Sequence, residues 1–246
     1  MRVHSHEVTY TPEGSPEELP AAVTDSPAAK IAPIQAALLA AYGQPTWRSH
    51  HPPLDELILT ILSQHTSDLN SGRAFTQLRA ALPTWEAVRD APVGAVADAI
   101  RSGGLAAVKA PRIQRVLRQI WDERGSFDLG FLATVPLDEA RAWLATLPGV
   151  GPKTAACVLL FSCGRPAMPV DTHVHRVSRR LGLVPDRTTA DQAHGLLEAL
   201  VPPAWYYAFH LNVIKHGREV CKAPRPRCEI CPLTAWCSYY QAAHAL

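Results

Sequence analysis

The sequence predicts an all-α fold, and three observations lead to this class. From Ala32 onward, apolar residues recur at steps of three and four, the spacing that places them on one face of a helix. Alternating apolar and polar residues, which are typical of strands, are sustained nowhere. Proline and glycine interrupt the helical pattern at short intervals, so we expect roughly nine or ten helices with short connections.

Composition narrows the class of protein. Of the 246 residues, 47% are hydrophobic and 19% are charged, which provides for a buried core in one or two domains and excludes an intrinsically disordered chain. No run approaches ~20 consecutive apolar residues, and the first residues lack an apolar core, so we expect neither a membrane span nor a secretory signal. These features predict a soluble, cytoplasmic protein that has no membrane partner, associated with the nucleoid if it is bacterial.

Charge is distributed unevenly along the chain. Residues 1–29 are rich in Pro, Ser, Glu and Ala, hold one arginine and five acidic residues, and are predicted to be a mobile tail. After Val150, eleven basic side chains stand against six acidic ones. This basic part is compatible with a polyanionic partner, although most charged clusters are only solvated faces.

The clearest amphipathic helix is expected in PPLDELILTILSQHTSD. Its apolar stripe consists of Leu54, Leu57, Ile58, Ile61 and Leu62. His65 follows at the next step of the same pattern. It is either a histidine of the core or a side chain that faces a partner at the end of the helix.

Two helices are predicted to meet at a tight turn in LPGVGPKTAACVLLF. Gly149 and Gly151 flank Val150, and an almost wholly apolar helix begins at Pro152. Glycine permits positive φ and the close approach of another backbone, and free amides at a helix start point outward with the positive end of the helix dipole. The turn therefore predicts a phosphate-binding cradle. The alternative is an ordinary turn between two helices.

Lys153 is the second residue of this apolar helix. Burial and the positive end of the helix dipole both disfavour a charged amine at this place. A neutral lysine is a nucleophile that can form a Schiff base. A structural lysine would more usually lie on a solvated face or near a helix C-terminus, so Lys153 is a candidate catalytic nucleophile.

Asp171 stands just ahead of a helix whose inner face holds Val174, Val177 and Leu181. By position it is an N-cap, which is the ordinary role of such an aspartate and adds ~1 kcal/mol. Only eighteen residues separate it from Lys153, so a helix followed by a turn can bring both side chains to one cleft. A carboxylate kept ionised by cap hydrogen bonds can stabilise positive charge that develops on a sugar.

Four cysteines crowd into 17 residues near the C-terminus, with six, two and five residues between them: Cys221, Cys228, Cys231 and Cys237. Without a secretory signal, this spacing favours a metal site over disulfides. Four thiolates bind either zinc or a 4Fe-4S cluster. Zinc sites more often use two separate Cys-x-x-Cys pairs, and only one pair is present, so the spacing favours the iron-sulfur cluster.

The first loop of this motif is cationic and suited to DNA phosphates, because it contains Lys222, Arg225 and Arg227. The two remaining cysteines, Cys157 and Cys163, lie on or just beyond the buried helix. We expect them to be core residues without a chemical role.

The segments LPGVGPKTA, VDTHVHR and the cysteine loop, in this order, resemble the endonuclease III family of helix-hairpin-helix (HhH-GPD) DNA glycosylases. The resemblance covers about residues 31–240. It implies that Lys153 is the Schiff-base nucleophile, that Asp171 is the catalytic carboxylate, and that the four cysteines hold a structural 4Fe-4S cluster. It also implies two helical lobes, one from residues 47–165 and one from 30–46 plus 166–246, with double-stranded DNA bound between them by a monomer.

The resemblance further implies two loops that enter the DNA duplex. LSQHTSDLN resembles the segment that fills the hole left by a flipped base, commonly with glutamine; here His65 aligns with that position and Gln64 precedes it. IRSGGLAAVKAPRI resembles the second loop, with Leu105 as an apolar wedge. Ala106 and Ala107 stand where relatives often have Tyr-Asn, so substrate preference is the least defined property.

The implied activity is that of a bifunctional DNA glycosylase and abasic-site lyase of base excision repair. Its expected substrates are oxidised pyrimidines, such as thymine glycol, and abasic sites in duplex DNA. One alternative is a mismatch or oxidised-purine glycosylase of the same fold. The other is a non-catalytic protein that binds DNA damage or a DNA structure, which the presence of both Lys153 and Asp171 disfavours.

Overall fold

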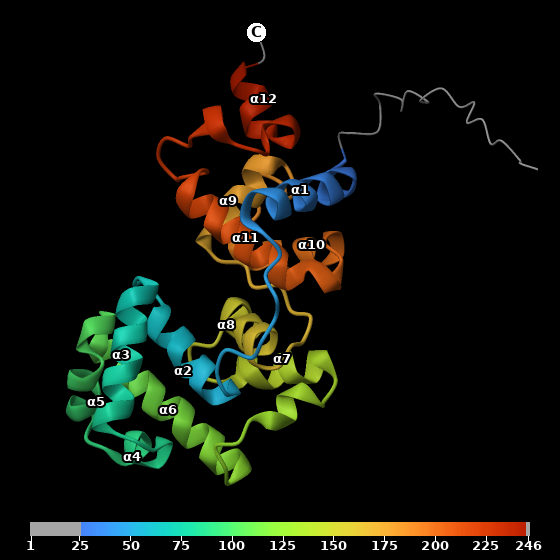
Figure 1. The fold of residues 1–246 in the computed structure, drawn as a ribbon. Coiled ribbons are helices and arrows are strands. Elements are labelled where there is room, and N and C mark those ends of the chain that lie inside the picture. The colour runs from blue at the N-terminus through green and yellow to red at the C-terminus, as the bar shows by residue number, and fades with distance from the viewer. Residues whose placement is uncertain (1–25, 245–246) are drawn as a thin grey trace, which may run out of the picture.

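The structure, a computed structural model, describes residues 26–244, and every regular element in this range is helical (Figure 1), which confirms the all-α class. The α-helices are α1 (Pro27–Tyr42), α2 (Pro53–Ser63), α3 (Asp68–Ala81), α4 (Trp85–Asp90), α5 (Val93–Ala99), α6 (Ala106–Arg124), α7 (Leu137–Thr146), α8 (Pro152–Cys157), α9 (Thr172–Leu181), α10 (Ala190–Leu200), α11 (Tyr206–Glu219) and α12 (Ser238–His244). Shorter helical segments are η1 (Arg101–Gly103), η2 (Gly130–Ala133), η3 (Val158–Ser162), η4 (Pro203–Trp205), η5 (Cys228–Ile230) and η6 (Thr234–Trp236).

The described range holds twelve α-helices, more than the nine or ten expected. The difference arises partly in residues 84–99, where two short helices follow each other. Thr84 caps α4, its Oγ1 accepting a hydrogen bond from the amide of Ala87 at 3.1 Å. Pro92 then separates α4 from α5, because a proline disfavours the helical conformation of the residue that precedes it.

Part of the predicted tail, residues 27–29, is helical. Residues 1–25 lie outside the described residues. Helix α1 begins at Pro27, and the hydroxyl of Ser26 accepts a hydrogen bond from the amide of Ala29 at 3.2 Å. The predicted boundary was therefore wrong by three residues, which form the first turn of a capped helix.

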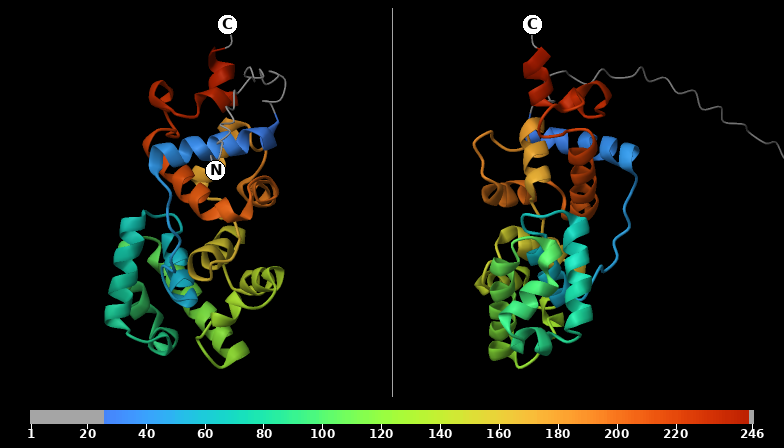
Figure 2. Two further views of the ribbon diagram at one scale, coloured as in Figure 1. Left: turned by 45° about the vertical axis from the view of Figure 1, so that its right-hand side comes forward. Right: turned by 90° about the vertical axis from the view of Figure 1, so that its left-hand side faces the viewer.

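Two hydrophobic cores organise the chain into two lobes (Figures 1 and 2). The first core is built by α2 to α7 and one part of α8, and the second by α1 and α9 to α11 with residues of the cysteine loop. Ala167 packs in the first core, although it follows the predicted boundary at residue 165. Helix α1 packs in the second core, so a segment from the N-terminal part of the chain joins the C-terminal helices in one lobe.

The helix formed by α8 and η3 contributes to both cores. Ala155, Ala156 and Leu159 pack in the first core. Cys157 and Leu160 pack in the second. A helix that is apolar around its circumference must be covered on all sides, so this segment fixes the two lobes relative to each other.

The second half of this helix is a π-helical turn, η3. The carbonyls of the last turn of a helix have no partner within the helix, and the linker between α1 and α2 supplies donors for two of them. The indole of Trp47 donates to the carbonyl of Leu160 at 2.8 Å, and the amide of His50 donates to the carbonyl of Phe161 at 3.2 Å. These bonds hold the linker across the boundary between the lobes.

Two ion pairs also join the lobes. Arg141 of α7 forms a bidentate pair with Glu198 of α10, with N–O distances of 2.6 and 2.9 Å. Arg218 of α11 lies 2.6 Å from a carboxylate oxygen of Asp68 at the start of α3. The first pair is the better shielded from water, so it contributes more to holding the lobes together.

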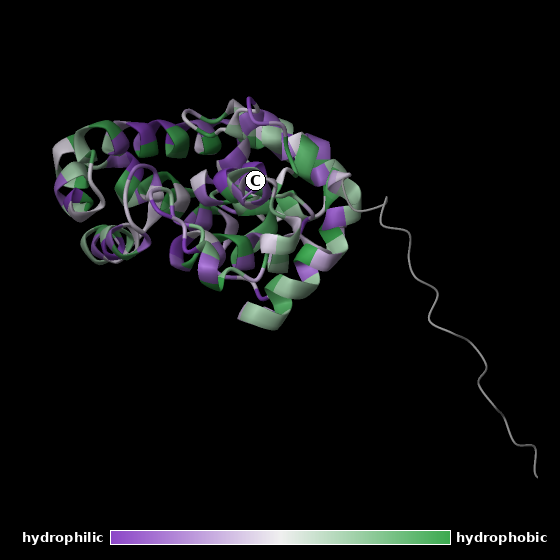
Figure 3. Cartoon of the chain, turned by 90° about the horizontal axis from the view of Figure 1, so that it is seen from above, coloured by the Kyte–Doolittle hydropathy of each residue, from purple (hydrophilic) through white to green (hydrophobic). Residues whose placement is uncertain are grey.

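Seen from above, most helices carry both hydrophobic and hydrophilic residues along their length (Figure 3). This is the pattern of helices that bury one face against a core. None of the helices in residues 26–244 combines the length and apolar content that crossing a membrane requires.

Candidate active site

A cavity of about 340 Å³ lies between the lobes and is lined by both Lys153 and Asp171. The structure thus brings together the two side chains that sequence reasoning singled out for catalysis. Helices α2, α3, α8 and α11 form the other walls. A cavity of this size that is open to solvent and lined by an amine and a carboxylate is a candidate active site.

Among residues 26–244, Lys153 is the only lysine that lines this cavity, and its side chain is half-buried. It is the second residue of α8, so the positive end of the helix dipole lies beneath it. Cys157 lines the cavity one turn further along the helix. Burial raises the pKa of the Cys157 thiol to about 11, so it stays protonated at neutral pH and leaves the amine as the nucleophile.

Asp171 caps α9 as predicted. Its Oδ1 accepts a hydrogen bond from the amide of Val174 at 2.7 Å. Among the described residues, the second oxygen, Oδ2, accepts no hydrogen bond. One oxygen therefore orients the carboxylate while the other remains available at the cavity.

Three side chains hold the extended segment that leads to Asp171. Glu198 Oε1 accepts a hydrogen bond from the amide of Met168 at 2.7 Å, and the Nδ1 atom of His194 lies 2.8 Å from the carbonyl oxygen of Met168. The Nδ1 atom of His210 lies 2.9 Å from the carbonyl oxygen of Pro169. The position of the carboxylate is thus set by the second lobe and not only by its own helix.

Two buried titratable residues of the cavity were missed by sequence reasoning. Burial lowers the pKa of His210 to about 4, so this imidazole is neutral at physiological pH. Burial raises the pKa of Glu56, which lies on α2 and whose Oε1 accepts a 3.4 Å hydrogen bond from the hydroxyl of Thr60. The available signal was an acid inside an apolar run, LDELILT, but only the fold places it near Lys153.

The predicted hairpin lies between α7 and α8. Gly149 has φ +77°, and a Cβ there would lie 2.6 Å from the Arg112 side chain. Both the backbone conformation and the lack of space therefore favour glycine at this position. Gly151 has an extended backbone, and a Cβ there would meet nothing within 4 Å. The space around Gly151 is therefore open to the approach of another molecule, while Gly149 shapes the turn.

The side chain of Gln64 is held within the protein. Its Nε2 donates to the carbonyl of Gly149 at 3.2 Å, and its Oε1 accepts from Arg112 at 2.8 Å. His65 is exposed instead, because α2 ends at Ser63. The interpretation of His65 as a core histidine is therefore wrong.

Left-handed backbone marks three predicted DNA-contacting residues. In the part of the chain that the structure describes, the non-glycine residues with positive φ are His65 (56°), Leu105 (52°) and Arg225 (57°). Such conformations are costly for residues with a Cβ and concentrate at functional sites. Leu105 is also 54% exposed, so its side chain is accessible to a partner.

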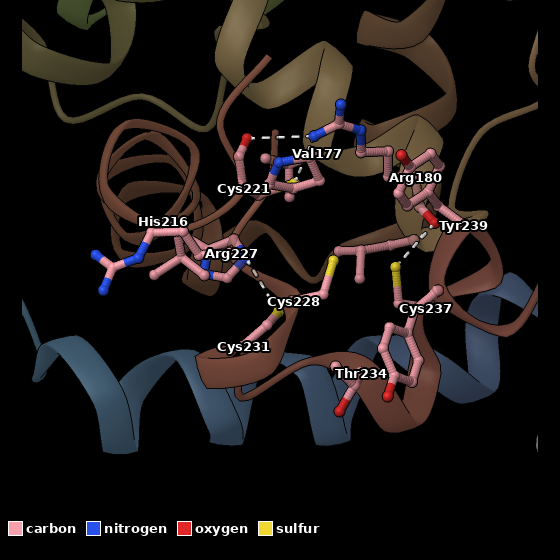
Figure 4. A pocket seen from close by; sticks show the side chains of 14 residues that line it. Val177, Arg180, His216, Cys221, Arg227, Cys228, Cys231, Thr234, Cys237 and Tyr239 are labelled. Carbon is pink, nitrogen blue, oxygen red and sulfur yellow. Dashed lines mark hydrogen bonds between the residues drawn. The ribbon is translucent and has the colours of Figure 1, made fainter. Parts of the chain in front are cut away.

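The four cysteines of the C-terminal loop line one pocket (Figure 4). Arg180 of α9 ties the loop down, donating to the sulfur of Cys221 at 3.2 Å and to the carbonyl of Lys222 at 2.8 Å. Four thiols around one pocket are the donor set that a 4Fe-4S cluster requires. Within residues 26–244, no three His, Cys, Asp or Glu side chains converge on a single point suited to one ion.

The cationic side chains of this loop face solvent. They are the exposed Lys222, Arg225 and Arg227. Arg227 lies 3.9 Å from Glu229, a weak exposed pair that leaves its guanidinium accessible. All three are therefore free to meet an anionic partner.

Comparison with known proteins agrees with this geometry. Endonuclease III of Thermotoga maritima is 35% identical over 189 residues, which are 77% of this chain and 84% of that protein. A solved structure described as a non-covalent endonuclease III–DNA complex has a TM-score of 0.75 and 29% identity, covering 88% of this chain and 98% of that chain.

Plant relatives are longer. One Arabidopsis thaliana protein is 34% identical over 192 residues, 74% of this chain and 66% of its own length. The DNA glycosylase/AP lyase ROS1 of Arabidopsis thaliana is 33% identical over 178 residues, 65% of this chain but only 13% of its own length. The chain thus spans two thirds or less of these plant proteins.

The HhH-GPD superfamily of base excision DNA repair proteins matches residues 58–203, which include the hairpin, Lys153 and Asp171. Together with the identity to endonuclease III over most of both chains, this match shows that the chain belongs to the HhH-GPD superfamily, as the resemblance implied.

Proposed function

We propose that this protein is a bifunctional DNA glycosylase and abasic-site lyase that removes oxidised pyrimidines from duplex DNA. The observation that carries the proposal is the shared cavity of Lys153 and Asp171. A nucleophilic amine beside a carboxylate suits chemistry at C1′ of a deoxyribose. The family of the chain and the endonuclease III–DNA complex that it resembles support the same reaction class.

In the proposed reaction, Nζ of Lys153 attacks C1′ and its lone pair forms the new carbon–nitrogen bond. The glycosidic bond breaks, and the base departs with the bonding electrons and takes up a proton. The C1′–O4′ bond then breaks, O4′ takes up a proton that Nζ releases, and a protonated imine forms between C1′ and Nζ. Loss of a proton from C2′ then expels the 3′ phosphate, which is the β-elimination step.

Asp171 acts by charge in this scheme. Positive charge develops on the sugar as the base leaves, and a fixed carboxylate near it lowers the free energy of that state. The cap bond from the amide of Val174 holds Oδ1, so Oδ2 can face the sugar. The anchors at Met168 and Pro169 keep this geometry from relaxing.

DNA is proposed to bind along the open side of the hairpin and the two exposed loops. The amides near Val150 and Gly151 would meet a phosphate, His65 would fill the space of the flipped base, and Leu105 would separate a base step. Gln64 is assigned to the support of the hairpin, because both ends of its amide are already bonded within the protein.

A 4Fe-4S cluster held by Cys221, Cys228, Cys231 and Cys237 is proposed to maintain the shape of the cationic loop. Its role would be structural, since the cysteine pocket is lined by residues other than those of the active-site cavity. The loop would then present Lys222, Arg225 and Arg227 to the phosphates.

Borohydride trapping on a panel of single-lesion duplexes tests the nucleophile and the substrate together. We expect the protein to form a covalent adduct most rapidly with thymine glycol and abasic sites, and more slowly with 8-oxoguanine or a mismatched adenine. Lys153→Gln should retain DNA binding and lose the adduct, because an amide is not nucleophilic. Trapping of this variant at the wild-type yield would show that another amine reacts.

Asp171→Asn separates the cap from the catalyst. Asparagine also caps helices, so we expect a stability change below ~1 kcal/mol. Excision should fall by about 10²-fold or more, because a neutral amide cannot offset the charge on the sugar. Single-turnover rates and thermal melts provide the two readouts, and near-normal excision would return Asp171 to a purely structural role.

The burial of Glu56 predicts an unusual pH dependence of the stability of the fold. The pKa of Glu56 is raised in the folded protein. At a pH between the ordinary and the raised pKa, the folded protein therefore holds a proton that the unfolded chain has lost. The free energy of unfolding falls as the pH rises through this range. We expect Glu56→Gln to raise the melting temperature at pH 7.5 and to lose this advantage near pH 4. The exposed Glu86→Gln is the matched control and should show no such gain. Equal melting temperatures of wild type and Glu56→Gln at pH 7.5 would contradict the prediction.

The cysteine pocket predicts a coloured protein. Anaerobically purified protein should be yellow-brown with broad absorbance in the blue, and Cys228→Ala should lose the colour and much of the soluble yield. Iron and sulfide analysis with visible spectroscopy provides the measurement. Stoichiometric zinc without iron would overturn the assignment of the cluster.

A further inference from the structure

Lys109 is a buried cation in the middle of the first lobe. It lies on α6 and is 2% exposed. Among the described residues it forms no ion pair with a carboxylate, and burial lowers the pKa of its amine. Burying an amine costs free energy unless hydrogen bonds compensate, so its partners identify its role.

Its partners are two backbone carbonyls, one in the last turn of α2 and one at the end of η1. Nζ donates to the carbonyl of Leu62 at 2.6 Å and to the carbonyl of Gly103 at 2.8 Å. Leu62 is three residues before His65, and Gly103 is two residues before Leu105. One amine therefore connects the segments that lead into two loops, which we call the His65 loop (residues 64–67) and the Leu105 loop (residues 104–105). The exposed residue that names each loop has left-handed backbone.

Both loops need an external restraint. His65 and Leu105 have φ of 56° and 52°, a region that residues with a Cβ avoid unless their surroundings impose it. The carbonyls that Lys109 holds lie at the base of each loop. An apolar side chain of similar length would fill the same space but would leave both carbonyls without a partner.

Helix α6 connects a third loop through its next turn. Arg112 lies three residues beyond Lys109 and donates to Gln64, which in turn donates to the hairpin carbonyl of Gly149. The buried face of α6 thus bonds to the His65 loop twice, to the Leu105 loop directly and to the hairpin through Gln64.

We propose that Lys109 is a positioning residue that sets the distance and orientation between the His65 loop and the Leu105 loop, so that both enter one duplex together. The inference rests on the proposed function, in which these loops displace a base. Lys109 itself is too deeply buried to touch DNA and acts through the two carbonyls.

Lys109→Met tests the proposal, because methionine keeps most of the volume and removes both hydrogen bonds. The measurement is the rate of cleavage at an abasic site in a fully paired duplex, divided by the rate at the same site in a single strand. Only the paired substrate requires both loops. We expect this ratio to fall at least about tenfold, since misplacement near 1 Å can cost ~10²-fold.

Lys30→Met is the matched control. Lys30 is also buried, at 4% exposure, and its amine lies 3.5 Å from the carbonyl of Leu181 at the end of α9 and 3.1 Å from the hydroxyl of Ser238. This substitution removes a buried amine from the second lobe, far in sequence from both loops. The thermal stability of the variant should fall. Its duplex-to-single-strand ratio should stay within about twofold of wild type, because the substitution leaves the His65 loop and the Leu105 loop untouched.

A cycle with Leu105→Ala shows whether Lys109 acts through the loop. If it does, Lys109→Met should reduce the ratio by much less in the Leu105→Ala background than in wild type, because the wedge is already lost. Full additivity of the two effects would count against the proposal.

The outcomes separate two failures. If the wild-type protein cleaves neither substrate, the proposed function is wrong. If it cleaves both and Lys109→Met leaves the ratio unchanged, the proposed function stands and the positioning role is overturned.

If circular dichroism shows Lys109→Met unfolded, Gly103→Ala decides by the same ratio. A Cβ on Gly103 would lie 3.0 Å from the Cβ of Ala74, so the two segments must separate by a few tenths of an ångström, which shifts the Gly103 carbonyl that Lys109 holds. A reduced ratio supports the proposal, and a ratio equal to that of wild type overturns it.

Discussion

The burial of one helix, residues 152–162, is the constraint on which the rest of the structure depends. Its residues pack into both hydrophobic cores, so neither lobe is complete without it. One face of this helix lines the cavity, and Lys153 stands at its N-terminal end. The requirement that an apolar helix be covered on all sides therefore also places the amine at the boundary of the lobes, facing the carboxylate that the second lobe supplies.

Much of the site could be predicted because its signals are local in sequence. The hairpin, the Asp171 cap and the cysteine loop each lie within a few residues, so spacing alone locates them, whereas their catalytic and cluster roles come from the resemblance and stay proposals. Lys109 gave no such signal, and the acid in the apolar run around Glu56 did not show where that side chain lies. Their roles depend on tertiary contacts: Lys109 reaches the carbonyl of Leu62, 47 residues away, and Glu56 meets the Lys153 cavity only after folding. The predicted number of helices was too low for a related reason, since a single capping residue such as Thr84 decides whether a short segment becomes a helix.

Helix α9 links two parts of the molecule that differ in chemistry. Asp171 caps its first turn, while Arg176 and Arg180 on its later turns donate to carbonyls of the cysteine loop. Arg176 donates to the carbonyl of Cys221 at 3.1 Å and to that of Gly217 at 2.8 Å. Any disturbance that displaces the cysteine loop therefore acts on the helix that orients the carboxylate, although the two pockets are lined by different residues.

The left-handed residues of the two loops have a consequence for how this scaffold can diversify. The bonds that hold the loops are made to the backbone carbonyls of Leu62 and Gly103, whereas the side chains of His65 and Leu105 face outward. Replacing either outward side chain leaves those bonds in place. Under the proposed function, divergence toward another lesion can thus proceed by single substitutions at these two positions, each of which would change the group offered to a base while the backbone beneath it is unchanged.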